Sequence, residues 1–119
     1  AEYLHDMFVG AASFDSDLSN WTVGNVRHFN GLFRGAKSFT GTGLENWDVS
    51  SGRLFMVMFA DTESLSHDMN IQHWKVGQAE SMTAMFRDSN FRGSLCEWAS
   101  QLHSTVGTSD MFVRSQCPD

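Results

Sequence analysis

A pair of large apolar residues returns along the chain at nearly constant intervals of 25, 26, 27 and 26 residues. The pairs are Met7-Phe8, Leu32-Phe33, Met58-Phe59, Met85-Phe86 and Met111-Phe112. A fixed period of about 20 to 50 residues is the sequence signature of repeat architectures. The pattern therefore predicts one leucine-rich-repeat-like solenoid domain over residues 1–119. Its units, about 4.5 in number, are expected at 7–31, 32–57, 58–84 and 85–110, with a closing fragment at 111–119.

Each unit begins with apolar residues spaced by three and four, such as Phe29, Leu32 and Phe33, a spacing that predicts one or two turns of helix. Asn25 and Ser51 precede these turns at positions where a side-chain oxygen could cap a helix. Two residues after each Phe stands a residue type that accepts a left-handed backbone, as a helix end requires. These residues are Gly10, Gly35, Asp61 and Asp88.

The four tryptophans form a second column, and around the first three of them apolar and polar residues alternate as Trp-x-Val. This period of two predicts short strands with Trp and Val inward, aligned in parallel between units. Polar residues beside the tryptophans would then face outward as a narrow strip. We call Asn20, Thr22, Asn46, Asp48, His73, Lys75 and Glu97 the polar strip and expect it to bind a partner.

Three alternatives to that use of the strip are open. The strip could be a plain solvated face without a partner. A partner could instead use the helix side, where Arg27, Arg53 and Glu80 recur in one register. It could also cover the N-terminal end at Tyr3 and Leu4.

Composition narrows the partner class. The chain has 8 basic and 14 acidic residues, a net charge of −6, and no basic stretch, which argues against nucleic acid and anionic membranes. No apolar run reaches the roughly 20 residues of a membrane-spanning helix, so we expect no membrane insertion. The sequence starts without an initiator Met, which suggests a processed chain or an excised portion.

The two cysteines, Cys96 and Cys117, both fall in the last unit. A disulfide between them would close the end of the repeat array, contribute roughly 3 kcal/mol and require an oxidising compartment. Two free buried thiols are the alternative. Zinc is not expected, because only His103 lies between the cysteines and no close-spaced ligand pair exists.

Catalytic and cofactor motifs are absent from the sequence. The five histidines fall at different phases of the repeat and form no metal-binding spacing, and the loop acids Asp15, Asp17 and Asp68 match no calcium loop. No nucleophile elbow, phosphate-binding glycine loop or paired-carboxylate site is present. We therefore expect no enzyme activity and no cofactor. Asn20 begins a glycosylation sequon that we expect to be unoccupied, because Trp21 within it points inward.

These columns resemble the BspA-like surface-protein repeat, a leucine-rich-repeat-like family. The closest matches are Met7-Phe8-Val9-Gly10-Ala11-Ala12-Ser13-Phe14 and Trp47-Asp48-Val49-Ser50, and the resemblance covers nearly the whole sequence. The last unit, with Leu95-Cys96-Glu97-Trp98 and Cys117-Pro118-Asp119, resembles members from microalgae and other protists. The resemblance implies a right-handed solenoid without catalytic residues, used for adhesion or assembly at cell surfaces or in secretory and lumenal compartments.

Function is therefore expected to be non-enzymatic protein–protein interaction or assembly, outside the cell, at its surface or in an organelle lumen. One alternative is a small peripheral subunit of an organellar membrane complex such as a lumenal photosynthetic assembly. Another is a carbohydrate- or ice-binding surface. The irregular strip, in which Thr22 gives way to Asp48 and Lys75, counts against that last reading.

Overall fold

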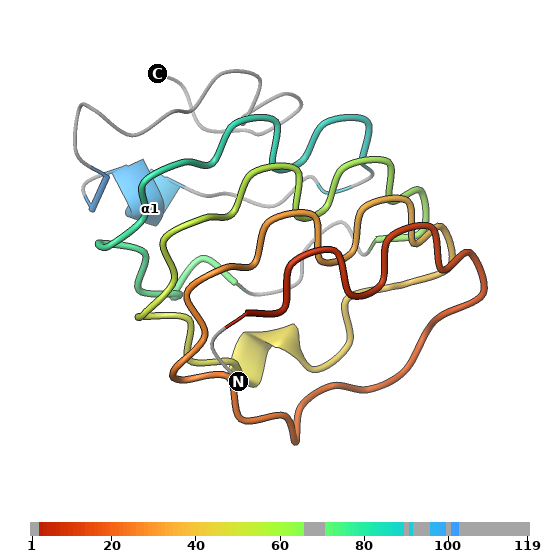
Figure 1. Ribbon diagram of the computed structural model, residues 1–119, viewed down its shortest axis with the longest axis horizontal. Helices are drawn as coiled ribbons and strands as arrows, with labels where there is room; N and C mark the ends of the chain where they lie inside the picture. The colour runs from red at the N-terminus through yellow and green to blue at the C-terminus, as the bar shows by residue number, and fades with distance from the viewer. Residues whose placement is uncertain (1–2, 66–70, 90, 92–95, 100, 103–119) are drawn as a thin grey trace.

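The computed structural model describes residues 3–65, 71–89, 91, 96–99 and 101–102 (Figure 1). Four segments in it share one conformation, and we call residues 3–11, 28–36, 54–62 and 81–89 the turn segments. Each is a succession of four-residue turns closed by backbone hydrogen bonds. In the second, for example, the Leu32 N–H donates to the Phe29 carbonyl at 3.2 Å and the Ala36 N–H donates to the Phe33 carbonyl at 2.9 Å. Figure 1 shows these segments as parallel waves.

Neighbouring turn segments are joined by backbone hydrogen bonds at every second residue. Between the first two segments the distances are 2.8–3.0 Å. The N–H groups of Leu4, Asp6, Phe8 and Gly10 donate to the carbonyls of His28, Asn30, Leu32 and Arg34. Equivalent rows of four, also at 2.8–3.0 Å, join the second segment to the third and the third to the fourth. Every second backbone donor of the first three segments is thus used across a contact, as buried polar groups require.

The predicted solenoid of short parallel strands and short helices is wrong for the residues that the structure describes. No strand or sheet occurs among them, and the pairing of Tyr3, His28, Leu54 and Ser81 consists of isolated parallel bridges. Their helical content is the three-residue 3-10 helix η1 (Leu44–Asn46) and the four-residue helix α1 (Cys96–Ala99). The molecule measures 36 × 30 × 20 Å, which is a compact body.

A left-handed residue in the middle of each turn segment explains why the predicted helices do not form. Gly31, Val57 and Ala84 have φ values of 68°, 49° and 55°, and Asp6 has the same sign at 58°. A residue with positive φ ends a right-handed helix, because the following N–H no longer points along the helix axis. The spacing of three and four fits two successive turns as well as it fits a helix.

The second left-handed column was correctly predicted. Gly10, Gly35, Asp61 and Asp88 have φ values of 70°, 75°, 59° and 56°. The first column was missed, because Val57 and Ala84 are residue types that rarely adopt this conformation. Their strain is about 1–2 kcal/mol each. Hydrogen-bond rows oppose it, on both sides of Val57 and on the third-segment side of Ala84.

The predicted strands are replaced by irregular backbone around each tryptophan. The backbone near each tryptophan forms local turns instead. For example, the Trp21 N–H donates to the Leu18 carbonyl at 3.1 Å. Among the described residues, no backbone hydrogen bond joins the segments 21–23, 47–49 and 74–76 to one another. Extended backbone without such a ladder is not a sheet.

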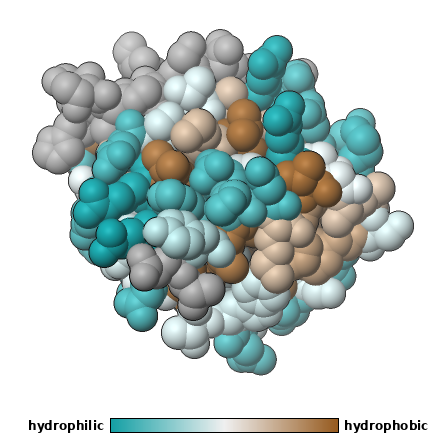
Figure 2. Space-filling model, in the orientation of Figure 1, coloured by the Kyte–Doolittle hydropathy of each residue, from teal (hydrophilic) through white to brown (hydrophobic). Residues whose placement is uncertain are grey.

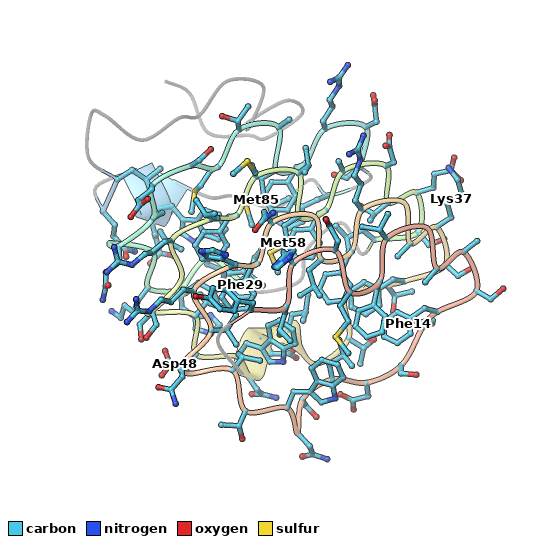
Figure 3. All side chains as sticks on the ribbon, viewed as in Figure 1. Phe14, Phe29, Lys37, Asp48, Met58 and Met85 are labelled. Carbon is cyan, nitrogen blue, oxygen red and sulfur yellow. The ribbon has the colours of Figure 1, made fainter. Side chains whose placement is uncertain are left out.

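The core is a set of aromatic columns that run through the turn segments (Figure 3). Phe8, Phe33, Phe59 and Phe86 stack in sequence with ring-centroid distances of 5.7, 5.6 and 5.3 Å. Phe29 stacks on Phe55 at 5.3 Å in a parallel column. The hydrogen-bond rows set this register, because they hold corresponding residues of neighbouring segments opposite each other. Offset-stacked pairs of this kind add about 0.5–1.5 kcal/mol each to the gain from burial.

Glycine at position 43 is required by close packing. Gly43 precedes η1 with a φ of 94°, and a Cβ there would lie 2.8 Å from the Leu18 nitrogen and closer still to Ser19 and Asp17. We expect Gly43→Ala to reduce the free energy of unfolding by more than about 2 kcal/mol, because strain and collision combine. Gly77→Ala is the control, since a Cβ at Gly77 meets nothing within 4 Å. Urea denaturation measures both, and equal stability of the two variants would contradict the prediction.

Candidate functional site

Tryptophan side chains connect successive copies of the repeat where a sheet was expected. The indole Nε1 of Trp47 donates to the Leu18 carbonyl at 2.9 Å, and that of Trp74 donates to the Leu44 carbonyl at 3.0 Å. Trp98 in α1 makes the same contact with the Ile71 carbonyl at 3.1 Å. Each indole therefore reaches the residue three positions before the preceding tryptophan. These buried bonds fix the backbone that carries the polar strip.

All seven residues of the polar strip are exposed. They are Asn20, Thr22, Asn46, Asp48, His73, Lys75 and Glu97. Between them lie side chains of the core, because Val23, Trp47, Val49, Trp74 and Val76 are all buried. The alternation of inward and outward positions was predicted from the sequence, although the backbone that produces it is not a strand.

Two aspartate side chains accept hydrogen bonds within turns beside the tryptophans. An Asp48 carboxylate oxygen accepts hydrogen bonds from the Ser50 hydroxyl at 2.6 Å and from the Ser50 N–H at 3.0 Å. These two bonds, the hydroxyl first, lower the pKa of Asp48, because both stabilise the charged form. One copy earlier, the Ser19 N–H donates to Asp17 at 2.9 Å and lowers the pKa of Asp17. Asp48 is thus held in one orientation as an anion.

His73 and Gln101 tie other parts of the surface together. The His73 Nε2 lies 2.8 Å from the Glu45 carbonyl, so this strip residue is anchored to the preceding copy. Gln101, beyond α1, accepts from the Val76 N–H at 2.8 Å and donates to the Trp74 carbonyl at 3.3 Å. The Gln101 side-chain amide thus makes the two hydrogen bonds that the backbone of a next copy could make to segment 74–76, because it supplies one acceptor and one donor.

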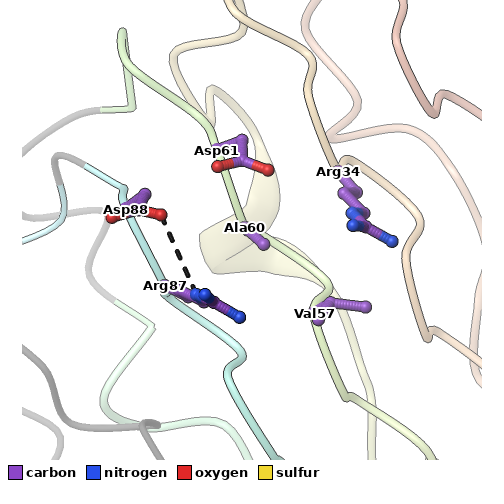
Figure 4. A pocket seen from close by; sticks show the side chains of 6 residues that line it. All are labelled: Arg34, Val57, Ala60, Asp61, Arg87 and Asp88. Atoms are coloured by element: carbon purple, nitrogen blue, oxygen red, sulfur yellow. Dashed lines mark ion pairs between the residues drawn. The ribbon is translucent and has the colours of Figure 1, made fainter.

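A hollow of about 200 Å³ lies on the second, third and fourth turn segments (Figure 4). Ala60 occupies the position that Arg34 and Arg87 occupy in the neighbouring turn segments, so a side chain is missing between two arginines. Asp61 and Asp88 also line it, and Arg87 lies 3.9 Å from Asp88. Two positive and two negative groups give the hollow no net charge with which to hold an ionic ligand. The hollow was not predicted from the sequence, although the replacement of arginine by Ala60 at this position of the repeat is visible there.

Two further ion pairs lie on exposed surface. Arg53 on the predicted helix side pairs with Glu80 at 3.0 Å, and Lys37 pairs with Glu63 at 3.5 Å. Each ion pair joins equivalent places in successive copies. Exposed pairs of this kind add about 0–1 kcal/mol, so they adjust the register of the copies and do not determine it.

The predicted disulfide falls outside the described residues, since Cys117 and the side chain of Cys96 are not among them. Within the described part, no group of three or more His, Cys, Asp or Glu side chains is placed to hold a metal ion. None of the helices described there is both long and apolar enough to cross a membrane.

The recurrent turn segments, the aromatic columns and the indole bonds define the molecule as a repeat protein. One family model matches residues 2–117, and its description is Mycoplasma protein of unknown function, DUF285. The chain belongs to the DUF285 family. No curated protein and no solved structure matches it.

The indole hydrogen bonds predict that Trp74 contributes more to stability than Trp21. Trp74→Phe removes the donor to the buried Leu44 carbonyl, whereas the Trp21 indole has no such partner among the described residues. We expect Trp74→Phe to lower the free energy of unfolding by about 1–3 kcal/mol more than Trp21→Phe, because a buried acceptor is left unpaired. Chemical denaturation of both variants measures the difference. Equal losses would show that the indole bonds contribute nothing beyond ring burial.

The bonds from Ser50 predict a pH effect. Ser50→Ala should raise the pKa of Asp48 towards the ordinary range of an aspartate, because the stronger of its two stabilising donors is lost. A lowered pKa contributes stability that is present above the unfolded pKa and is lost as the pH falls through the folded pKa. The stability difference between wild type and Ser50→Ala should therefore shrink in that acidic window. Titration by carboxyl-carbon NMR, with Ser51→Ala as the control, would contradict this if both variants left the pKa unchanged.

Proposed function

We propose that this chain is a non-enzymatic protein–protein interaction module whose polar strip contacts the partner. The observation that supports it is the exposure of all seven strip residues on backbone that buried indole bonds hold in place. A pre-ordered surface loses little conformational entropy on binding, so polar contacts there translate into affinity. Repeat proteins commonly use such surfaces for recognition.

The chemistry of the strip favours a protein surface of mixed charge. It contains two carboxylates, Asp48 and Glu97, and one ammonium group, Lys75, beside a histidine, a threonine and two amides. A uniform anionic ligand would be repelled by the overall charge of −6. A partner that places a cation opposite Asp48 and an anion opposite Lys75 would be complementary, and complementary charges determine specificity and association rate.

Family membership is consistent with this use. The resemblance to BspA-like surface repeats supports a role in adhesion or assembly at a cell surface or in a lumenal compartment. We therefore propose that the chain acts in adhesion or assembly at a cell surface or in a lumenal compartment. DUF285 itself carries no assigned function, so the residues of the strip remain the basis of the proposal.

Charge reversal tests the strip. We expect the double variant Asp48→Lys, Lys75→Glu to lose at least tenfold in the yield of cross-linked partner from an extract of the native source. Its free energy of unfolding should change by no more than about 1 kcal/mol, because both side chains are exposed.

The matched control is the double variant Lys37→Glu, Glu63→Lys, which exchanges an exposed ion pair away from the strip. It should retain the partner. If both double variants retain the full yield, the strip is not the contact surface. Mass spectrometry of the cross-linked peptides identifies the surface that is used instead.

A further inference from the structure

Asn20, Trp21 and Thr22 form the one glycosylation sequon in the sequence. The acceptor sequence for an N-linked glycan is Asn-x-Ser/Thr, with any middle residue except proline. The inward direction of Trp21 is the reason to expect an unoccupied sequon. The groups that the modification uses, however, are the Asn20 amide and the Thr22 hydroxyl, on either side of Trp21. The surroundings of these two groups therefore decide whether the site is accessible.

Asn20 and Thr22 lie on the surface because of their place in the repeat, and not because they belong to the first copy. Both residues are exposed. The residues at the same two places of the second and third copies are exposed as well, although the turn segments of those copies are hydrogen-bonded on both sides. These residues are Asn46, Asp48, His73 and Lys75. The outward direction is thus a property of the backbone around each tryptophan.

The backbone at the sequon forms a turn and not a strand. The bond from the Trp21 N–H to the Leu18 carbonyl closes a four-residue turn with Asn20 at its third position. Within the described part of the chain, neither Asn20 nor Thr22 makes a hydrogen bond. In Figure 1 the chain between the first two turn segments runs along the lower rim, and Figure 2 shows hydrophilic side chains, teal and white, on that rim. A bulky group can be added at such a place without breaking a contact.

We propose that Asn20 carries an N-linked glycan. The Asn20 Nδ2 attacks the anomeric carbon of the first sugar in an oligosaccharide that is linked to a lipid diphosphate. A bond forms between Nδ2 and the anomeric carbon, the bond from that carbon to the phosphate oxygen breaks, and the lipid diphosphate leaves. Nδ2 loses one proton, and no oxidant or reductant is required. The proposal rests on the cell-surface or lumenal setting proposed above, and not on the existence of a protein partner for the strip.

A glycan at Asn20 changes how much of the polar strip a protein can reach. A sugar chain is bulky and hydrated, so it covers Asn20 and Thr22 and keeps a protein away from them. A protein partner then contacts the strip from Asn46 onward, which includes Asp48 and Lys75. The charge-reversal variants change only that part of the strip. The partner contact and the glycan can therefore fail independently.

Mass spectrometry of the protein from its native source tests the modification. Trypsin cleaves after Arg27, the first basic residue of the sequence, so one tryptic peptide contains both Asn20 and Asn25. Electron-transfer fragmentation of that peptide should place a mass composed of N-acetylhexosamine and hexose units on Asn20. Asn25 belongs to no sequon and is the internal control, which should stay unmodified.

Secretion of the full chain behind a cleavable signal peptide, from a eukaryotic cell, tests the sequon apart from the native compartment. The wild-type chain and Thr22→Ser should both carry a glycan that peptide N-glycosidase removes. Thr22→Val keeps the shape of the side chain but lacks the hydroxyl, so it should be secreted without a glycan. Because Thr22 makes no hydrogen bond within the described part, all three chains should be secreted in equal amounts.

Two results would overturn the proposal, and they differ in what else they contradict. An unmodified Asn20 in both the native and the secreted chain would show that the turn does not present the sequon to the transferring enzyme. An unmodified Asn20 in the native chain alone, with a glycan on the secreted one, would contradict the cell-surface or lumenal setting as well. Neither result bears on the contact through Asp48 and Lys75, which the cross-linking yield measures separately.

Discussion

The rows of backbone hydrogen bonds between turn segments are the constraint on which the rest of the structure depends. Four bonds at each of three contacts, all of 2.8–3.0 Å, connect segments more than twenty residues apart in sequence. Each bond contributes only about 1 kcal/mol net, but together the bonds leave one register available. A shift by one residue would exchange the inward and outward side chains of a whole segment. The aromatic columns can stack only in the observed register.

The hydrogen-bond rows also explain the unusual backbone. A turn every few residues brings alternate N–H groups to one side and the corresponding carbonyls to the other, which requires left-handed residues at regular places. Glycine and aspartate supply most of them, whereas Val57 and Ala84 adopt the conformation at a cost. Contacts with neighbouring segments, not local preference, hold these two residues there. The indole bonds do the same task around the tryptophans, where no backbone hydrogen bond joins the described segments 21–23, 47–49 and 74–76.

Sequence periodicity predicted the repeat, the buried columns and the outward strip, because all three depend on spacing alone. It was wrong about secondary structure. Phe29, Leu32 and Phe33 have the spacing of a helix, yet Gly31 between them has positive φ and the segment forms two turns. The Trp-x-Val pattern has the period of a strand, yet the side chain of Trp47 takes the contact that a backbone ladder would make. Periodicity reports which side chains point inward and does not report which hydrogen bonds the backbone makes.

Amide hydrogen exchange measures the central constraint most directly. If the hydrogen-bond rows hold the molecule together, the amides of Phe33, Gly35, Phe59 and Asp61, which donate across contacts at 2.8–2.9 Å, should exchange most slowly. Their opening free energies should equal the global free energy of unfolding, because breaking one row separates the copies. Exchange of these amides within about tenfold of the rates of an unstructured peptide would contradict the role assigned to the rows.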